Sequence, residues 1–505
     1  MSSDWSETLY AALTGPVGAT VVLVLYSIGV LLVMLYSIGQ FHLLYYYLRL
    51  RKRTDLHPPM PVVGAGQLPF VTVQLPMFNE RYVAAAVIDS CAALEYPRDR
   101  FELQVVDDSN DDTRDIVDER AAFWNARGVK VSVARRDNRR GFKAGAMAAA
   151  TPAALGEIIA IFDADFRPHS DFLLRTVPYF ANANVGAVQA RWGHINRDYS
   201  LLTRAQTLLH DAFFLVEQET RHRAGFFIRF NGSAGLWRKS CIDDAGGWQS
   251  DTLSEDFDLC LRAQMRGWKF IYTCDVEAPA EIPVTIQDYK AQQFRWTKGR
   301  GQVIRKLLFP LLRTPLPPMV KFHAVFDLLN VIIIPGIFLI AITSSWFIVA
   351  LRENPWMMVA AAAFGVSQIN IVLVPWFSWV ALRHYRKTVG GTLIEFAKTF
   401  PPFVFLLVGS TLMMCVALVD GFRNKPSFFH RTAKYNIVKS GDTWRSKLYR
   451  PTAVSALTWF EGLLALCFMG ALALDFRLGS YAFAPFHFSL SLGFSVVFLR
   501  SLFKA

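Results

Sequence analysis

The chain has 505 residues, of which 53% are hydrophobic, and this is too apolar for an ordinary soluble protein of its length. Part of the chain must therefore lie in lipid. Its 53 Lys and Arg against 41 Asp and Glu give a net charge of +12, which suits nucleic acid, acidic phospholipid or an anionic substrate equally well. Six cysteines without Cys-x-x-Cys spacing predict neither a disulfide framework nor a zinc site, and this suits a reducing compartment.

Residues 17–48 predict a transmembrane helix. They contain no Asp, Glu, Lys or Arg and exceed the roughly 20 apolar residues that cross a bilayer. A cleavable signal peptide would have a basic start and a shorter apolar core, so we interpret residues 1–53 as a permanent anchor. The basic sequence "RLRKR" at 49–53 places the next part of the chain, from residue 54 onward, in the cytoplasm.

Residues 54–318 are predicted to form a cytosolic α/β domain. Apolar runs suited to buried strands alternate with segments of helical length, and this order predicts a doubly wound, mostly parallel sheet. Ligands bind such sheets beyond the carboxyl ends of their strands. The strands are expected at 70–76, 101–109, 129–136 and 158–165.

Acidic residues follow three of these strands: Glu80 the first, Asp107 and Asp108 the second, and Asp163 and Asp165 the fourth. Carboxylates gathered at one edge would repel each other without a cation. Mg²⁺ typically binds one or two carboxylates together with substrate phosphates, so these residues predict a metal and diphosphate site. An Asp-x-Asp sequence also arises by chance or caps a helix, but its position after "IIAIF" favours the site.

Two further segments carry candidate chemistry. "RRGFKAGAM" at 139–147 could bring Lys143 and backbone amides to a phosphate, or could be a loop with a solvated lysine. "SEDFDL" at 254–259 could be a capping box on Ser254, or could supply Glu255 and Asp256 as carboxylates that take a proton from an attacking hydroxyl. The residues alone leave both choices open.

The segment "QQFRWTKGRG" at 292–301 places Gln292, Arg295 and Trp296 on one face of a helix. A buried Trp beside a surface Arg is the ordinary interpretation. The alternative is a binding face, because an indole offers a flat support for a sugar ring while Arg and Gln can donate hydrogen bonds to pyrophosphate.

The C-terminal part, residues 319–505, is predicted to be a transmembrane and interfacial helix region. Basic segments at 383–387 and 423–450 both suit the cytoplasm. A single crossing between them would put one outside, so we expect residues 400–422 to be a re-entrant or interfacial element that begins at Pro401 and Pro402. The apolar runs cover 322–350, 357–382, 400–422, 453–474 and 482–502.

Four of these motifs, in this order, resemble the signature of membrane-embedded family two glycosyltransferases, which is D, D-x-D, (T/S)-E-D and Q-x-x-R-W. The resemblance covers roughly residues 65 to 310. The chain looks most similar to cellulose-synthase-like glucomannan and xyloglucan-backbone synthases and to bacterial cellulose synthase catalytic subunits. The motifs are "DD" at 107, "DAD" at 163, "SED" at 254 and "QQFRW" at 292, with "QLPMFNE", "GFKAGAM", "FNGSAG" and "FFHRTAKYNI" in support.

The resemblance implies an inverting GT-A transferase that uses a nucleotide-diphospho-sugar and Mg²⁺ or Mn²⁺. Asp256 would be the base, with Glu255 beside it, and Asp165 and Asp163 would hold the metal. The acceptor would contact Trp296, Asn231 and Gly232. The nucleotide-sugar would contact Asp107, Asp108, Asp163, Glu80, Lys143, Gln292 and Arg295. Ser254 departs from the more common Thr, and the chain ends at "SLFKA", so we expect no C-terminal regulatory domain.

The function expected from this resemblance is processive synthesis of a β-linked glucan or mannan at the plasma, bacterial inner or Golgi membrane, with UDP-glucose as donor. Partners would be the growing glycan and the bilayer, with an export protein as a further candidate, but no nucleic acid. One alternative is a GDP-mannose-dependent β-mannan synthase, and another transfers a single sugar to a lipid such as ceramide. A nucleotide-regulated transporter is disfavoured, because the apolar runs hold few ionisable residues besides Asp327 and Glu461.

Overall fold

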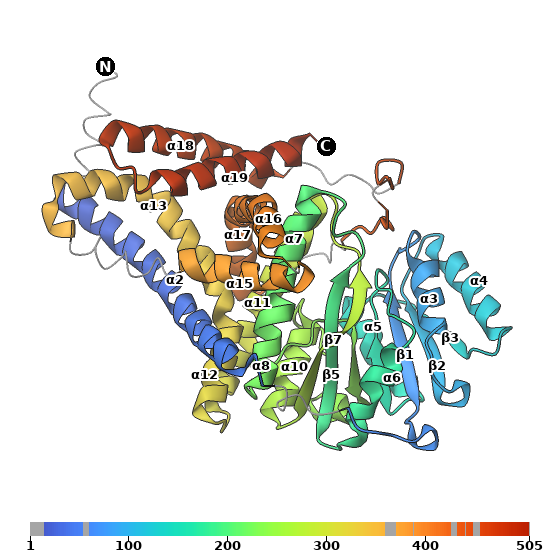
Figure 1. The fold of residues 1–505 in the computed structure, drawn as a ribbon. Helices are drawn as coiled ribbons and strands as arrows, with labels where there is room; N and C mark the ends of the chain where they lie inside the picture. The colour runs from blue at the N-terminus through green and yellow to red at the C-terminus, as the bar shows by residue number, and fades with distance from the viewer. Residues whose placement is uncertain are drawn as a thin grey trace.

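The computed structural model describes residues 15–53, 60–358, 370–386, 388–425, 432–439, 441–447 and 455–503. An α/β domain lies on one side of the molecule and long helices lie on the other (Figure 1). The N-terminal helix α2, Pro16–Leu50, runs beside α13, Ile333–Glu353, in the helical part. Parts of several predicted segments fall outside the described residues, among them 359–369 and 428–431.

The α/β domain is built on one seven-stranded sheet. Its order is β3-β2-β1-β4-β6-β5-β7, and β6 runs antiparallel to both of its neighbours while the other pairs are parallel. This confirms the predicted mostly parallel sheet. The strands are β1 Val71–Met77, β2 Phe101–Asp107, β3 Val131–Ala134, β4 Ile158–Ile161, β5 Val185–His194, β6 Gly235–Arg238 and β7 Lys269–Ala280.

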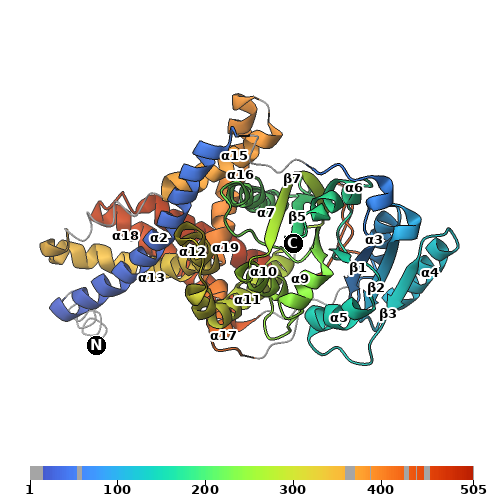
Figure 2. The same ribbon diagram turned by 90° about the horizontal axis from the view of Figure 1, so that it is seen from below.

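Both faces of the sheet are covered, and this explains why its strands are continuous apolar runs. In β4, Ile158 and Ala160 pack into the core that holds α3, Ala84–Ala92, whereas Ile159 and Ile161 pack into a second core on the opposite face. Figure 2 shows α4, Thr113–Asn125, and α5, Phe142–Ala150, on opposite sides of strands β1 to β3.

Further helices follow strands β4 to β7 along the chain. The longest of them is α11, Ile286–Arg313, which connects the α/β domain to the apolar helices (Figure 1). A π-helix at Ala212–Gln218 joins α7 to α8. The remaining helices of this part are α6 Phe172–Thr176, α7 Leu201–Asp211, α8 Glu219–Arg223, α9 Lys239–Asp244 and α10 Glu255–Met265.

The described part of the chain contains five helical stretches that are long and apolar enough to cross a membrane. They are α2, the stretch Pro318–Glu353, α16 Val389–Gly409, α18 Ala456–Leu478 and α19 Ala484–Leu502. The protein is therefore a multi-pass membrane protein, as its composition predicts. The stretch Pro318–Glu353 comprises α12, Pro318–Leu329, and α13. Two shorter helices also lie in this part of the described chain, α15 Asn370–Tyr385 and the apolar α17 Thr411–Phe422.

The predicted start of the 400–422 element is wrong. Pro401 and Pro402 lie inside α16, whose first turn is instead capped by the Thr388 hydroxyl, which accepts a hydrogen bond from the Gly391 amide at 3.1 Å. Proline is tolerated within membrane helices because neighbouring groups satisfy the freed carbonyls. Ser410 separates α16 from α17. The re-entrant or interfacial position of this region in the membrane stays a prediction.

Helix α11 packs closely against α17 because glycines face each other across the contact. A Cβ on Gly421 would lie 2.3 Å from the backbone oxygen of Lys298, and a Cβ on Gly301 would lie 2.9 Å from the backbone oxygen of Leu418. No side chain fits at either position without moving a backbone. This contact fixes α11, which carries the "QQFRW" segment, against the apolar helices.

We expect Gly421→Val to destabilise the protein by about 1–3 kcal/mol, since overpacking forces apart two backbones in contact. Gly470→Val is the matched control, because Gly470 also lies inside an apolar helix but a Cβ there meets nothing within 4 Å. Thermal unfolding of the full chain in detergent should show a lower midpoint for the first variant alone. Equal midpoints for the two variants would contradict close packing of α11 on α17.

Candidate active site

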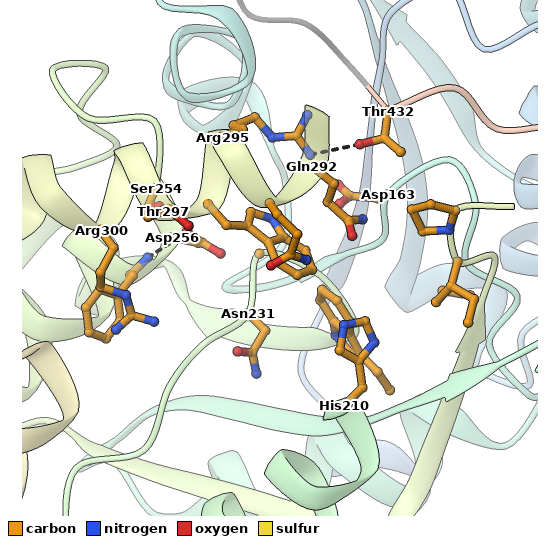
Figure 3. Close-up of a pocket in the computed structure, with 18 of the residues that line it drawn as sticks. Asp163, His210, Asn231, Ser254, Asp256, Gln292, Arg295, Thr297, Arg300 and Thr432 are labelled. Carbon is orange, nitrogen blue, oxygen red and sulfur yellow. Dashed lines mark hydrogen bonds between the residues drawn. The ribbon is translucent and has the colours of Figure 1, made fainter. Parts of the chain in front are cut away.

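A cavity of about 570 Å³ opens at the carboxyl ends of β1 and β4 and continues past α11 between the apolar helices. Figure 3 shows a close-up of it, with Asp256 and Asn231 on one side and Gln292 and Arg295 from α11 above. Its inner end is lined by residues of α2, α13, α15, α16 and α17, among them Tyr36, Ile337, Phe377, Phe403 and Met414. The cavity therefore joins the edge of the sheet to the membrane region.

Most of the predicted site residues meet at this cavity. Twelve of the thirteen line it, namely Glu80, Asp108, Lys143, Asp163, Asp165, Asn231, Gly232, Glu255, Asp256, Gln292, Arg295 and Trp296. Asp107 does not line it. Its buried carboxylate accepts hydrogen bonds from the Ser109 amide at 2.9 Å and from Arg135 Nε at 3.0 Å, so it braces the loop after β2. The adjacent Asp108 pairs with Arg136.

The Asp-x-Asp turn after β4 presents two carboxylates, and an ammonium group lies against each. Lys143 from α5 donates to Asp163 and, at 2.9 Å, to the Gly232 carbonyl. Lys434 pairs with Asp165. Burial lowers the pKa of Lys143 and of Lys434, but the facing carboxylates outweigh it, so the net shift of each pKa is upward. Both lysines therefore stay charged.

Asp163 and Asp165 fit a divalent cation of the kind that completes its shell with phosphates. Among the described residues no group of three or more His, Cys, Asp or Glu could hold a metal ion, so the protein alone supplies an incomplete set of ligands. One or two carboxylates plus substrate phosphates is the usual arrangement for Mg²⁺. The two ammonium groups already at these carboxylates show that the turn attracts cations.

Asp256 lies in the first turn of α10, where its carboxylate accepts a hydrogen bond from the Phe257 amide at 2.8 Å. Ser254 is the N-cap residue but makes no side-chain cap bond, so the structure does not support the capping box. Burial raises the pKa of Asp256, and burial with the nearby Asp256 charge raises that of Glu255. Gly232 lets its loop approach, because a Cβ there would lie 2.7 Å from Asp256 Oδ2.

Thr285 caps the start of helix α11, because its hydroxyl accepts a hydrogen bond from the Asp288 amide at 3.1 Å. Further along the helix, Gln292, Arg295 and Trp296 line the cavity. The Gln292 Oε1 atom is buried and has no hydrogen-bond partner within the described ranges of the chain. Burial lowers the pKa of Arg295, although the surrounding carboxylates oppose this shift. Trp296 is not sealed in a core, since it borders the cavity as the binding-face interpretation requires.

Sequence reasoning missed the residues that the segment 432–439 brings to the cavity. Glu281 holds this segment, because its carboxylate accepts hydrogen bonds from the amides of Tyr435 at 3.0 Å and Asn436 at 2.7 Å. Thr432 and Lys434 thereby reach Arg295 and Asp165. The segment belongs to the "FFHRTAKYNI" sequence that supports the family resemblance, but nothing in its composition assigns a role to Lys434.

Residues 69–299 match a family model described as "Glycosyltransferase like family 2". The chain is 42% identical over 255 residues to glucomannan 4-beta-mannosyltransferase 9 of Arabidopsis thaliana. This match covers 50% of this chain and 48% of the relative. It is also 42% identical over 258 residues to glucomannan 4-beta-mannosyltransferase 1 of Oryza sativa subsp. japonica, covering 50% of each. The chain thus spans about half the length of these curated relatives.

Among solved structures, the fold is similar to that of a mannosyltransferase from Pyrobaculum calidifontis in complex with GDP-Man and Mn²⁺. The TM-score is 0.53 at 20% identity, and the match covers 80% of this chain and 100% of the other. This likeness concerns the fold, which is of GT-A type as predicted. Residues 69–299 are therefore similar in sequence to a glycosyltransferase domain of family 2 and to the matched half of the plant glucomannan 4-beta-mannosyltransferases.

Proposed function

We propose that the protein is a membrane β-mannan or glucomannan synthase that uses GDP-mannose. One observation carries this proposal: a single cavity holds the Asp256 carboxylate, the Trp296 indole and the Asp163 and Asp165 carboxylates. The relatives' names support mannose as the transferred sugar. GDP-mannose therefore replaces UDP-glucose as the expected donor, because the named activity of the relatives is 4-β-mannosyl transfer.

In the proposed reaction Asp256 accepts the proton of an acceptor hydroxyl. The hydroxyl oxygen attacks C1 of the donor mannose from the side opposite the diphosphate, and the bond between C1 and the diphosphate oxygen breaks. An α-linked donor therefore gives a β-linked product. Lys143, Lys434 and Arg295 are placed to hold the diphosphate as its charge grows. A divalent ion at Asp163 and Asp165 would add positive charge for the leaving group.

The inner end of the cavity supports a polymeric product. It leads from Trp296 to aromatic and aliphatic side chains of the apolar helices, such as Tyr36, Phe377 and Phe403. A sugar chain that grows by one residue per cycle needs a path away from the Asp256 carboxylate. Flat aromatic rings suit the apolar faces of sugars along such a path. We therefore propose a processive enzyme whose product enters the membrane region.

A donor screen on the purified full-length protein tests this function. With Mn²⁺ or Mg²⁺ we expect incorporation from radiolabelled GDP-mannose into ethanol-insoluble material whose linkage analysis shows β-1,4-mannosyl units. UDP-glucose and UDP-N-acetylglucosamine should give less product. Product found only in the chloroform-soluble fraction would instead indicate transfer of a single sugar to a lipid. Preference for UDP-glucose alone would overturn the choice of donor.

Asp256→Asn should abolish transfer and leave donor binding intact. The amide keeps the shape of the side chain but cannot take the proton, so we expect transfer to fall by about 10²- to 10⁴-fold. Asp198→Asn is the matched control, since Asp198 lies on the surface, where an ion pair with Arg204 contributes little. Calorimetric titration with GDP should give similar affinities for the wild type and both variants. Full activity of the Asp256 variant would exclude it as the base.

The pH dependence of transfer should report the burial of Asp256. Burial raises the pKa of this carboxyl above its ordinary 3.8. As the solution is acidified, the carboxylate is therefore protonated, and stops acting as a base, at a higher pH than an exposed aspartate. The acidic limb of kcat/KM should therefore lie above pH 3.8. Glu255→Gln should leave this limb in place, because burial and the Asp256 charge raise the pKa of Glu255 to about 7, so that its carboxyl is already neutral where Asp256 titrates. A limb at or below pH 3.8 would contradict Asp256 as a buried base.

A further inference from the structure

One wall of the cavity takes no part in the proposed transfer. It is formed by His210, the penultimate residue of α7, which lies between two indole rings. The centroid of the His210 ring is 5.9 Å from that of Trp296 and 6.4 Å from that of Trp192 on β5. All three side chains line the cavity. Sequence reasoning gave His210 no role.

The His210 imidazole is buried and incompletely hydrogen-bonded. The residue is 8% exposed, and its Nδ1 atom has no hydrogen-bond partner among the described residues. Burial lowers the pKa of His210 to about 4, so the ring is neutral at physiological pH. A neutral imidazole has one nitrogen that donates a hydrogen bond and one that accepts. His210 is therefore equipped to bind a hydroxyl group, which also donates and accepts.

Other polar atoms that face the same cavity also lack a hydrogen-bond partner in the part of the chain that the structure describes. They are the Asn231 Nδ2 atom, the Gln292 Oε1 atom and both ring nitrogens of His194, all of them buried. Figure 3 shows the side chains of His210, Asn231 and Gln292 around one open region, with Asp256 at its edge. Leaving a buried polar group unsatisfied costs about 1–3 kcal/mol, and native structures contain few such groups. Several of them around one cavity point to a ligand that supplies polar partners.

The chemistry of this wall fits a sugar ring. A pyranose has faces of C–H groups, which pack on indoles, and an equatorial belt of hydroxyls, which exchange hydrogen bonds with neutral side chains. The surroundings of His210 provide both, with an indole on two sides and amide groups nearby. A histidine that only filled the core would be expected to have its buried nitrogen satisfied.

Neighbouring residues hold His210 in position. The next residue, Asp211, accepts a hydrogen bond from the Tyr385 hydroxyl of α15 at 3.0 Å. The π-helix at Ala212–Gln218 comes directly after it, and such segments are frequent at functional sites. His194, at the end of β5, lies 5.3 Å from His210 between ring centroids and closes the wall. A binding residue needs this kind of rigid support.

We propose that His210 binds the acceptor: its imidazole exchanges a hydrogen bond with a ring hydroxyl of the sugar that rests on Trp296, opposite Asp256. This inference rests on the proposed function, since it assumes a glycan acceptor. It adds a residue that selects the acceptor sugar and orients the attacking hydroxyl. Asn231 and Gln292 contact the same sugar from the neighbouring walls.

Direct binding of an oligosaccharide tests this role. Calorimetric titration of the full-length protein, saturated with GDP, with β-1,4-linked mannotriose should show about tenfold weaker binding for His210→Leu, the loss expected from one hydrogen bond of about 1.4 kcal/mol. His210→Gln, which can still donate and accept, should retain part of the affinity. His169→Leu is the control, because His169 is exposed and distant in sequence from the cavity residues of α7. The affinity for GDP should stay the same in all variants.

Unchanged mannotriose affinity in His210→Leu, or no mannotriose binding by the wild-type protein, would overturn the inference. If His210→Leu fails to fold, the His210→Gln variant is measured in its place. A His210→Gln variant that binds mannotriose as tightly as the wild type, and that has an unchanged KM for the acceptor, would then count against the inference. The proposed function fails separately. A wild-type protein that binds mannotriose through His210 but transfers no mannose from GDP-mannose would disprove the synthase while leaving the acceptor site in place.

Discussion

The site depends on charge balance among the side chains that line one cavity. Eight carboxylates line it, and six lysine and arginine side chains lie among them. Since an unpaired buried charge is costly, each group constrains the position of its neighbours. The carboxylates exceed the cations by two, which leaves the site receptive to a divalent ion that arrives with a diphosphate. The groups at the centre of the proposed reaction are Asp163, Asp165, Glu255 and Asp256 with Lys143, Lys434 and Arg295.

The three cations come from parts of the chain that are far apart, and this makes α11 the centre of the molecule. Arg295 lies on α11 itself. Lys434 comes after the apolar helix α17 in the chain. The residue next to Lys434, Tyr435, donates a hydrogen bond from its hydroxyl to Asp288 of α11 at 3.1 Å. Two residues further along α11, Lys290 donates to Glu461 of α18 at 2.7 Å. The same helix thus positions both the apolar helices and the proposed catalytic groups.

The sequence predicted the features that local patterns encode. Buried parallel strands appear as apolar runs, so β1 to β4 and the acidic turn after β4 could be found. The antiparallel strand β6 and the pairing of Lys434 with Asp165, which are 269 residues apart, depend on long-range contacts that no local pattern contains. Asp107 was expected to contact the nucleotide. It does not line the cavity, and its carboxylate pairs with the guanidinium of Arg135. The donor sugar depends on the shape of the pocket, which the motifs do not encode.

The ionisable groups within the apolar helices also distinguish a glycan path from an ion path. Asp327 pairs with Arg221 and Arg229, Glu461 pairs with Lys290, and Asp475 contacts His487 at 2.7 Å. Each carboxylate has a partner inside the protein, so an ion moving past would have to compete with a buried pair at every step. A neutral sugar chain makes no such demand. It needs only hydroxyl partners and flat apolar surfaces, which Tyr36, Phe377 and Phe403 provide along the inner end of the cavity. The pairing that holds the helices together is therefore consistent with the proposed path for an uncharged polymer and disfavours an ion path.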